Sequence, residues 1–179
     1  CRHGPTHQAG PEGTGEVSQA PDELQLRVVT DKTELCRIML ASWGSHSMMI
    51  DLHVYDVAEI DALGLFEPSG KTAALASWTV RGDSAYLCAL HSLKPGEGIA
   101  IRMLDAVIYA ARKAGAKKLK AMLTNDNMPG MTFYQRRGFR LSGLYLEAID
   151  HYRSVEPDII KTGYKDIPIH DAIELEIAL

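Results

Sequence analysis

The sequence predicts an α/β protein in which a mixed, mostly antiparallel sheet of about six to seven strands is flanked by about four helices. Three observations predict this fold class. Three β-rich runs follow one another with turn residues between them. A run of helical apolar spacing then precedes two further β-rich runs, and the last residues alternate apolar with polar. With 179 residues, 46% of them hydrophobic, the chain is long enough for one core and short for two independent domains. We therefore expect a single domain over residues 24–179.

Composition and charge exclude several classes of protein. The net charge is −4 and the Lys and Arg residues are scattered, so no nucleic-acid surface is expected. No apolar run is long enough for a membrane span, and residues 1–19 lack the apolar core of a signal peptide, so a cytoplasmic protein is expected. The three cysteines are widely spaced, which favours reduced thiols, and no metal site is predicted. A homodimer is compatible with this composition.

The N-terminal part is predicted to contain a tail, a strand and a helix. Residues 1–23 are rich in Gly, Pro, Ser, Thr and Gln, which predicts a disordered tail. Residues 24–29 alternate in the pattern of a half-buried strand. Asp31 and Glu34 have capping-box spacing before an expected helix at 33–42, and a glycine follows to end it.

The remaining elements follow from local periodicity. Residues 48–60 fit no single period, and we expect a helix or an irregular loop there. The predicted strands are 63–66, 73–80, 85–91, 118–123, 139–146 and 173–179, and the predicted helices are 99–114 and 129–137. The first three of these strands should form an antiparallel meander, because short turns join them.

Two glycines before the 99–114 helix form a candidate anion site. Gly96 and Gly98 allow the backbone to approach a phosphate without a Cβ clash, and the first helical turn offers free N–H groups. Taken alone, two such glycines more often only shape a strand-to-helix turn. A second motif is needed to decide between these explanations.

Residues 124–139 carry the second motif. An Asn follows a strand, a Gly comes three residues later, Phe-Tyr comes three residues after that, and Arg-Gly-Phe leads into the next strand. These residues are Asn127, Gly130, Phe133, Tyr134, Arg137, Gly138 and Phe139. Together with Gly98-Ile99-Ala100 upstream, this spacing resembles the GCN5-related N-acetyltransferase family. The resemblance covers residues 24–179. It implies transfer of an acetyl group from acetyl-CoA to a primary amine of a small molecule or peptide, by direct attack in a ternary complex.

The resemblance also implies roles for individual residues. Tyr134 would be the general acid that protonates the departing CoA thiolate. The acetyl-CoA contacts that it implies are Leu90, His91, Ser92, Gly96, Glu97, Gly98, Ile99, Ala100, Asn127 and Tyr134. The structural alternative for Tyr134 is a half-buried tyrosine whose hydroxyl is satisfied by packing partners.

Three residues depart from the family pattern. Pro95 stands in place of Gln or Arg, Glu97 puts a carboxylate beside the expected pyrophosphate, and Tyr86 occupies the position of a Glu base. The motif therefore assigns no general base. His91 is the nearest candidate for this role because its ordinary pKa lies near neutrality. The departures motivate a second hypothesis, an acyl-CoA-binding sensor or regulatory module with weakened catalysis. An unrelated α/β interaction protein is the least favoured hypothesis.

Other candidate residues have simpler explanations. Asp126 stands in a polar loop, where carboxylates are usually solvated, and Cys88 stands in an apolar strand, where thiols are usually buried and inert. For four apolar side chains core packing is favoured over a role in an acceptor pocket. They are Trp43, Met48, Met49 and Trp78.

The Ile-Pro-Ile segment at 167–169 resembles one near the C-terminus of an uncharacterised branch of the family. If the likeness extends to its flank, His170 and Asp171 can reach the acceptor site. A polar turn before the last strand is the favoured explanation.

Overall fold

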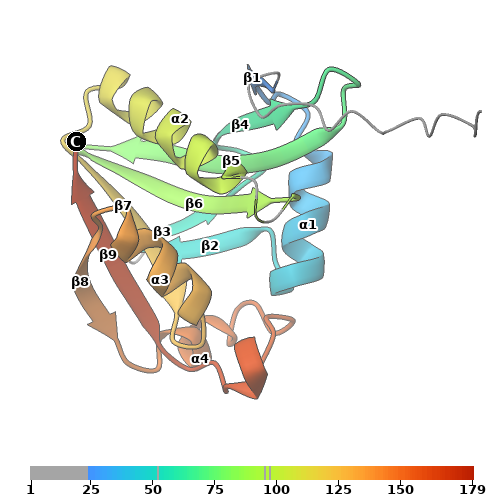
Figure 1. The fold of residues 1–179 in the computed structure, drawn as a ribbon. Coiled ribbons are helices and arrows are strands. Elements are labelled where there is room, and N and C mark those ends of the chain that lie inside the picture. The colour runs from blue at the N-terminus through green and yellow to red at the C-terminus, as the bar shows by residue number, and fades with distance from the viewer. Residues whose placement is uncertain (1–23, 52, 95, 97) are drawn as a thin grey trace, which may run out of the picture.

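The fold is a twisted mixed sheet with helices on both faces. The computed structural model describes residues 24–51, 53–94, 96 and 98–179, so the predicted tail lies outside the described residues. A seven-stranded sheet has the order β1-β4-β5-β6-β7-β9-β8, and a two-stranded sheet pairs β2 with β3 (Figure 1). Within the larger sheet, as described, β6 and β7 run parallel and the other neighbours run antiparallel. The predicted fold class is confirmed.

The elements have the following bounds. The strands are β1 (Gln25–Val28), β2 (Ser47–Ile50), β3 (His53–Asp56), β4 (Asp61–Phe66), β5 (Thr72–Arg81), β6 (Ser84–Ser92), β7 (Lys118–Thr124), β8 (Arg140–Tyr145) and β9 (Ala172–Ala178). The helices are α1 (Thr33–Trp43), α2 (Ile99–Lys113), α3 (Met128–Arg136) and α4 (Ala148–Tyr152), with a 3-10 turn at Tyr164–Asp166. No helix of the described residues is long and apolar enough to cross a membrane.

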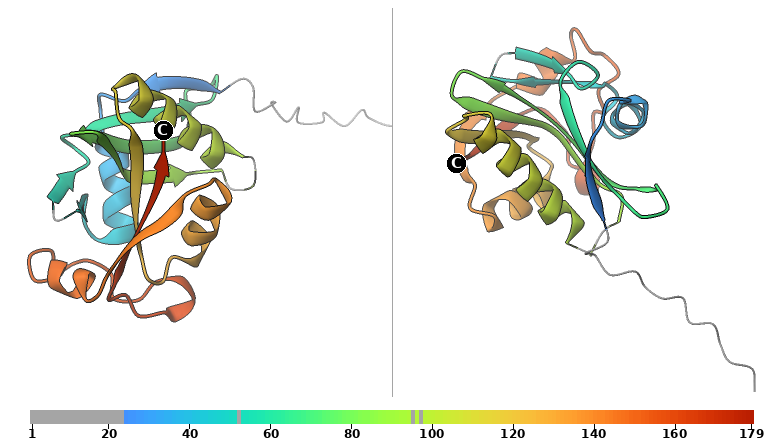
Figure 2. Two further views of the ribbon diagram at one scale, coloured as in Figure 1. Left: turned by 90° about the vertical axis from the view of Figure 1, so that its left-hand side faces the viewer. Right: turned by 90° about the horizontal axis from the view of Figure 1, so that it is seen from above.

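Two apolar clusters lie on opposite faces of the sheet. One contains Met103 and Leu104 of α2, both fully buried against the central strands. The other joins Leu35 and Met39 of α1 to Ile50 of β2. Figure 2 shows α1 and α2 on opposite sides of the sheet. The burial of both faces follows from the apolar stripes that the sequence places on these helices.

The start of α1 differs from the predicted capping box. Asp31 Oδ1 accepts hydrogen bonds from the backbone N–H of Thr33 at 3.0 Å and from its hydroxyl at 2.7 Å. Glu34 does not fold back to the cap, because its Oε2 accepts a hydrogen bond from the Thr72 hydroxyl of β5 at 2.7 Å. The predicted stop at Gly44 is confirmed, since this residue has a φ of 90° and donates its N–H to the Leu40 carbonyl.

The expectation of a helix or irregular loop at 48–60 is wrong. The segment contributes most of the β2–β3 hairpin, and Asp51, with a φ of 52°, lies in its turn. Its buried apolar anchors are Ile50 and Val57, which pack with α1. A spacing of seven residues between anchors also occurs on one face of a helix, so the local pattern does not indicate a hairpin and tertiary packing decides the conformation here.

The two chain ends differ in how far the predicted alternation is buried. In β1 the apolar Leu26 and Val28 are exposed, because this edge strand pairs with β4 and the whole strand faces solvent. In β9, Leu175 is fully buried, and Ile173 and Ile177 are partly buried against the same cluster. The prediction of an inward face is therefore confirmed for the last strand and wrong for the first.

A long excursion between β8 and β9 was not predicted. Residues 146–171 include α4 and the 3-10 turn, and they pack through Ile149, Tyr152 and Ile159 against Trp43. The Ile160 N–H donates to the Trp43 carbonyl at 3.2 Å. The excursion is thereby held close to the end of α1.

Candidate functional site

The site begins where the two parallel strands part. β6 pairs with β7 over Ser84–Leu87, and no further pairs follow in the described strands. A bulge lies at the same point, because Ser77 pairs with Ala89 and Trp78 with Leu87, which leaves Cys88 without a residue opposite it in β5. A bulge bends its strand, so the bulge accounts for the divergence of β6 from β7. Beyond it, the backbone groups of β6 that face β7 are open to a ligand.

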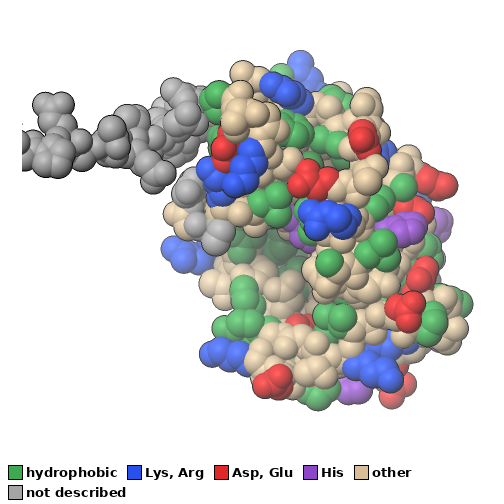
Figure 3. Space-filling view, turned by 90° about the vertical axis from the view of Figure 1, so that its right-hand side faces the viewer, with side chains coloured by type: hydrophobic (Ala, Val, Ile, Leu, Met, Phe, Trp, Pro, Cys, Tyr) green, Lys and Arg blue, Asp and Glu red, His purple; other side chains and the backbone are tan. Residues whose placement is uncertain are grey.

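A cavity of about 420 Å³ lies in this opening. Its walls come from α1, β2, β6, β7, α3 and the first turn of α2. Figure 3 shows the hollow on this face of the molecule, with hydrophobic side chains within it. Of the predicted contact residues, Leu90, His91, Ser92, Ala100, Asn127 and Tyr134 line this cavity.

A second pocket of about 480 Å³ adjoins the first at the start of α2. It contains Gly96, Gly98 and Ile99, and both pockets share Ser92 and Ala100. The two glycines have φ values of 87° and 69°, a left-handed conformation that favours glycine. Gly98 is the N-cap of α2, so the free N–H groups of the first turn point toward this pocket.

Positive charge comes from the far wall of this second pocket. The exposed Arg136 and Arg137 line it and have no ion pair in the described part of the chain. Lys94 lines it too, but its ammonium pairs with Glu67, and this pairing lowers the pKa of the Glu67 carboxyl. The predicted contact at Glu97, like the departure at Pro95, lies outside the described residues.

Tyr134 occupies the wall between the cavity and the core. Its ring packs edge-on against Phe133 and Phe139, each with a centroid distance of 5.1 Å. The side chain is 7% exposed, so Tyr134 is more deeply buried than the half-buried packing tyrosine that was the alternative to a catalytic role. Burial raises the pKa of its hydroxyl, which therefore keeps its proton at neutral pH. Within the described structure the hydroxyl makes no hydrogen bond, so its proton is available to a ligand.

His91 and Cys88 line the same cavity from β6. His91 Nε2 lies 3.2 Å from the Met39 sulfur, and burial lowers the pKa of this imidazole. It is therefore neutral at pH 7 and able to accept a proton. Cys88 is buried as expected, and burial raises the pKa of its thiol to about 12. A thiol in that state is a poor nucleophile.

The Asn-x-x-Gly spacing has a local structural reason. Asn127 is the N-cap of α3, and its Oδ1 accepts a hydrogen bond from the Gly130 N–H at 2.8 Å. A Cβ at Gly130 would lie 2.8 Å from that same oxygen, so a small residue is required. The cap orients the helix that carries Tyr134, and it leaves the Asn127 amide nitrogen for a ligand.

Several candidates lie away from the cavity. Tyr86 donates its hydroxyl to Asp51 at 3.0 Å, and neither residue is part of the cavity lining. His170 Nδ1 lies 2.6 Å from Asp150, and Asp171 Oδ1 accepts the Glu147 N–H at 2.7 Å. Both therefore belong to the turn before β9, as the favoured explanation has it.

The expectation of a solvated Asp126 is wrong. The side chain is 6% exposed, and its Oδ2 accepts the Tyr164 N–H at 2.8 Å. The 146–171 excursion covers it, and a Cβ at Gly163 would lie 1.9 Å from Oδ2. Burial here depends on a contact between distant segments, which the polar sequence around Asp126 does not indicate.

Part of the cavity wall was not predicted from the sequence. Trp78 and Met49 pack in the core as expected, while Trp43 and Met48 line the cavity as well as packing. The wall residues not predicted include Met39, Ser42, Met122, Thr124, Thr132 and Arg136. Helical spacing within α1 and α3 was a usable signal for four of these. Among the described residues, no group of three or more His, Cys, Asp or Glu side chains is arranged to hold a metal ion.

Comparison with known proteins gives consistent matches. The sequence model of the family described as FR47-like protein matches residues 62–146. The uncharacterized protein YxbD of Bacillus subtilis (strain 168) is 31% identical over 133 residues, which are 74% of this chain and 84% of YxbD.

Two solved structures share the fold. An IAA acetyltransferase from Bacillus cereus ATCC 14579 has a TM-score of 0.71 at 15% identity, covering 87% of this chain and 99% of that one. A GNAT family acetyltransferase from Elizabethkingia anophelis with acetyl-CoA bound has a TM-score of 0.71 at 17% identity, covering 88% and 99%. These matches agree with the parted parallel strands and with the capped helix that carries Tyr134. The chain belongs to the GCN5-related N-acetyltransferase family.

Proposed function

We propose that this protein transfers an acetyl group from acetyl-CoA to a primary amine of a small molecule or peptide. The observation that carries the proposal is the Tyr134 hydroxyl, protonated and without a hydrogen-bond partner in the described structure, in the wall of a cavity between parted parallel strands. The acetyl-CoA bound to the Elizabethkingia relative of the same fold supports the choice of donor.

The described residues fit acetyl-CoA. Its pantetheine arm contains amides, and the open backbone groups of Leu90, His91 and Ser92 can pair with them as a neighbouring strand would. The pyrophosphate is suited to the start of α2, where the N–H groups and the helix dipole favour negative charge. Arg136 and Arg137 supply the countercharge from α3 and the turn after it.

The chemistry needs one proton acceptor and one proton donor. The amine nitrogen attacks the thioester carbonyl carbon, and the new C–N bond forms as the amine gives up a proton. His91, neutral because burial lowers its pKa, accepts that proton. When the C–S bond breaks, Tyr134 donates its phenolic proton to the thiolate, and solvent returns a proton from His91 to Tyr134. An amide and the free CoA thiol are the products.

One observation favours a second candidate, an acyl-CoA-binding sensor or regulatory module with weakened catalysis. Tyr86 stands at the position of the family's Glu base, and its hydroxyl is engaged with Asp51 and Arg81 away from the cavity. Catalysis must then rely on His91 alone, or it is weak.

The test combines a binding assay with a turnover assay. Acetyl-CoA should raise the melting temperature by mass action, and free thiol should appear when a panel of primary amines is added. Binding without amine-dependent thiol release would favour the sensor, and no melting shift at millimolar acetyl-CoA would contradict both candidates.

A further inference from the structure

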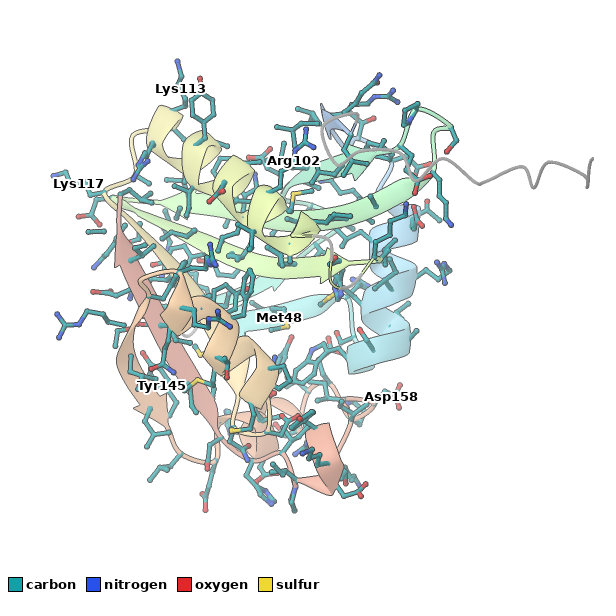
Figure 4. The ribbon with its side chains drawn as sticks, in the orientation of Figure 1. Met48, Arg102, Lys113, Lys117, Tyr145 and Asp158 are labelled. Carbon is teal, nitrogen blue, oxygen red and sulfur yellow. The ribbon has the colours of Figure 1, made fainter. Side chains whose placement is uncertain are left out.

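The acceptor side of the cavity is built from apolar side chains. Met39 and Trp43 come from α1, Met48 from β2 and Met122 from β7, and the hydroxyls of Ser42 and Thr124 are the polar groups beside them. Figure 4 labels the Met48 side chain, which lies between α1 and α3 in that view. Thioethers and an indole offer a polarizable surface that favours apolar and aromatic groups.

The same cavity lacks charged groups. Among the described residues that line it there is no Asp, Glu, Lys or Arg, and His91, Cys88 and Tyr134 are uncharged at pH 7. Asp126, next to the lining residue Asn127, is buried and its Oδ1 has no hydrogen-bond partner among the described residues, but it does not line the cavity. Two other carboxylates outside the lining are already paired. Asp51 Oδ2 lies 2.8 Å from Arg81 Nη2, and Glu174 Oε1 lies 3.2 Å from Lys120 Nζ.

This neutrality selects the form of the amine. A buried ammonium without a carboxylate partner is strongly disfavoured, so an amine that enters is shifted toward its neutral form. The neutral form is also the nucleophile, so the wall assists the reaction of a monoamine. A second ammonium on the same molecule has no partner in the described wall and must stay in water.

The size of the cavity limits the acceptor as well. About 420 Å³ has to hold the thioester end of the donor together with the acceptor. This is near the lower end of the volumes typical of small-molecule sites. The excursion at 146–171 packs against Trp43, so it holds one side chain of the cavity wall in place.

We infer that the acceptor is a small monoamine with an apolar or aromatic body and no second positive charge. This inference rests on the proposed acetyl transfer and adds the substrate class. The neutral methionine and tryptophan wall, together with the absence of a carboxylate among the described lining residues, carries it.

A matched pair of amines tests the inference. Hexylamine and 1,6-diaminohexane differ in one terminal group, and kcat/KM for hexylamine should be higher by at least about 100-fold, because the second ammonium cannot be desolvated in the cavity. 2-Phenylethylamine should behave like hexylamine. Equal or better use of the diamine would overturn the inference, and so would a peptide with an apolar first residue that is used faster than both monoamines.

Two variants place a carboxylate in the wall. Met48→Glu should shift the ratio of the two kcat/KM values toward the diamine by at least about tenfold, whereas the uncharged Met48→Gln should not. Ser42, exposed at the end of α1, offers a second pair if Met48→Glu does not fold, with Ser42→Asp expected to act like the glutamate and Ser42→Asn as its control. An unchanged ratio in a folded carboxylate variant would contradict the inference.

A binding measurement separates this inference from the proposed function. In the presence of CoA, hexylamine should raise the melting temperature more than 1,6-diaminohexane at equal concentration. This binding preference is measurable even if no thiol is released. That result would contradict the proposed acetyl transfer and support the inferred acceptor class. Thiol release with a preference for the diamine would give the opposite outcome, with acetyl transfer supported and the inference overturned.

Discussion

Removing the Tyr134 hydroxyl is the most direct perturbation of the proposed mechanism. In Tyr134→Phe the ring keeps its edge-on contacts with Phe133 and Phe139. The hydroxyl has no hydrogen-bond partner in the described structure, so its loss leaves no buried group unpaired, and the free energy of unfolding should change by less than about 1 kcal/mol. Turnover should fall roughly 10- to 1,000-fold, about 1.4 to 4 kcal/mol of transition-state stabilisation, because the thiolate loses its proton donor.

Steady-state kinetics and thermal melts on the same variant form the assay. The affinity for acetyl-CoA should change little, so the loss should appear in kcat. Tyr152→Phe is the matched control, because that tyrosine is 2% exposed and packs in the cluster at α4 rather than in the cavity wall. A kcat of Tyr134→Phe within about twofold of wild type, at an unchanged melting temperature, would show that Tyr134 is not the proton donor.

Three further predictions concern the anion site, the base and the last strand. Gly98→Asp should abolish the acetyl-CoA-dependent rise in melting temperature. Gly98→Asn should keep part of this rise, because asparagine tolerates the φ of 69° and carries no charge. Equal rises in the two variants would argue against a pyrophosphate at the start of α2. Burial lowers the pKa of His91 from 6.5, and a general base is active above its pKa, so the acid-side fall of kcat/KM should be centred below pH 6.5. This fall should be lost in His91→Gln. An unchanged acid-side fall in that variant would assign the general base to another residue. Deletion of residues 173–179 should abolish cooperative melting, since β9 pairs with both β7 and β8 and buries Leu175 completely; a cooperative melt near the wild-type temperature would show that the strand is peripheral.

Local sequence determined those elements whose periodicity agrees with their packing. The apolar stripe of α2 and the alternation of β9 each match one buried face, and both were predicted within a few residues. The α3 motif was readable because its chemistry is local. The Asn127 cap, the small residue at Gly130 and the placement of Tyr134 all depend on contacts within one helix and the turn after it.

Tertiary structure alone decided the parts that depend on distant segments. The burial of Asp126 and the acceptor wall each join segments that are far apart in the chain, and the local β2–β3 hairpin packs against the distant α1. Met48 lines the cavity together with residues of α1, β6 and β7, and no periodicity within residues 47–50 encodes those neighbours. The fold class and the motif at residues 127–139 thus follow from local sequence. The shape and neutrality of the acceptor pocket arose only on folding, because a cavity is defined by the side chains that different elements bring to one place.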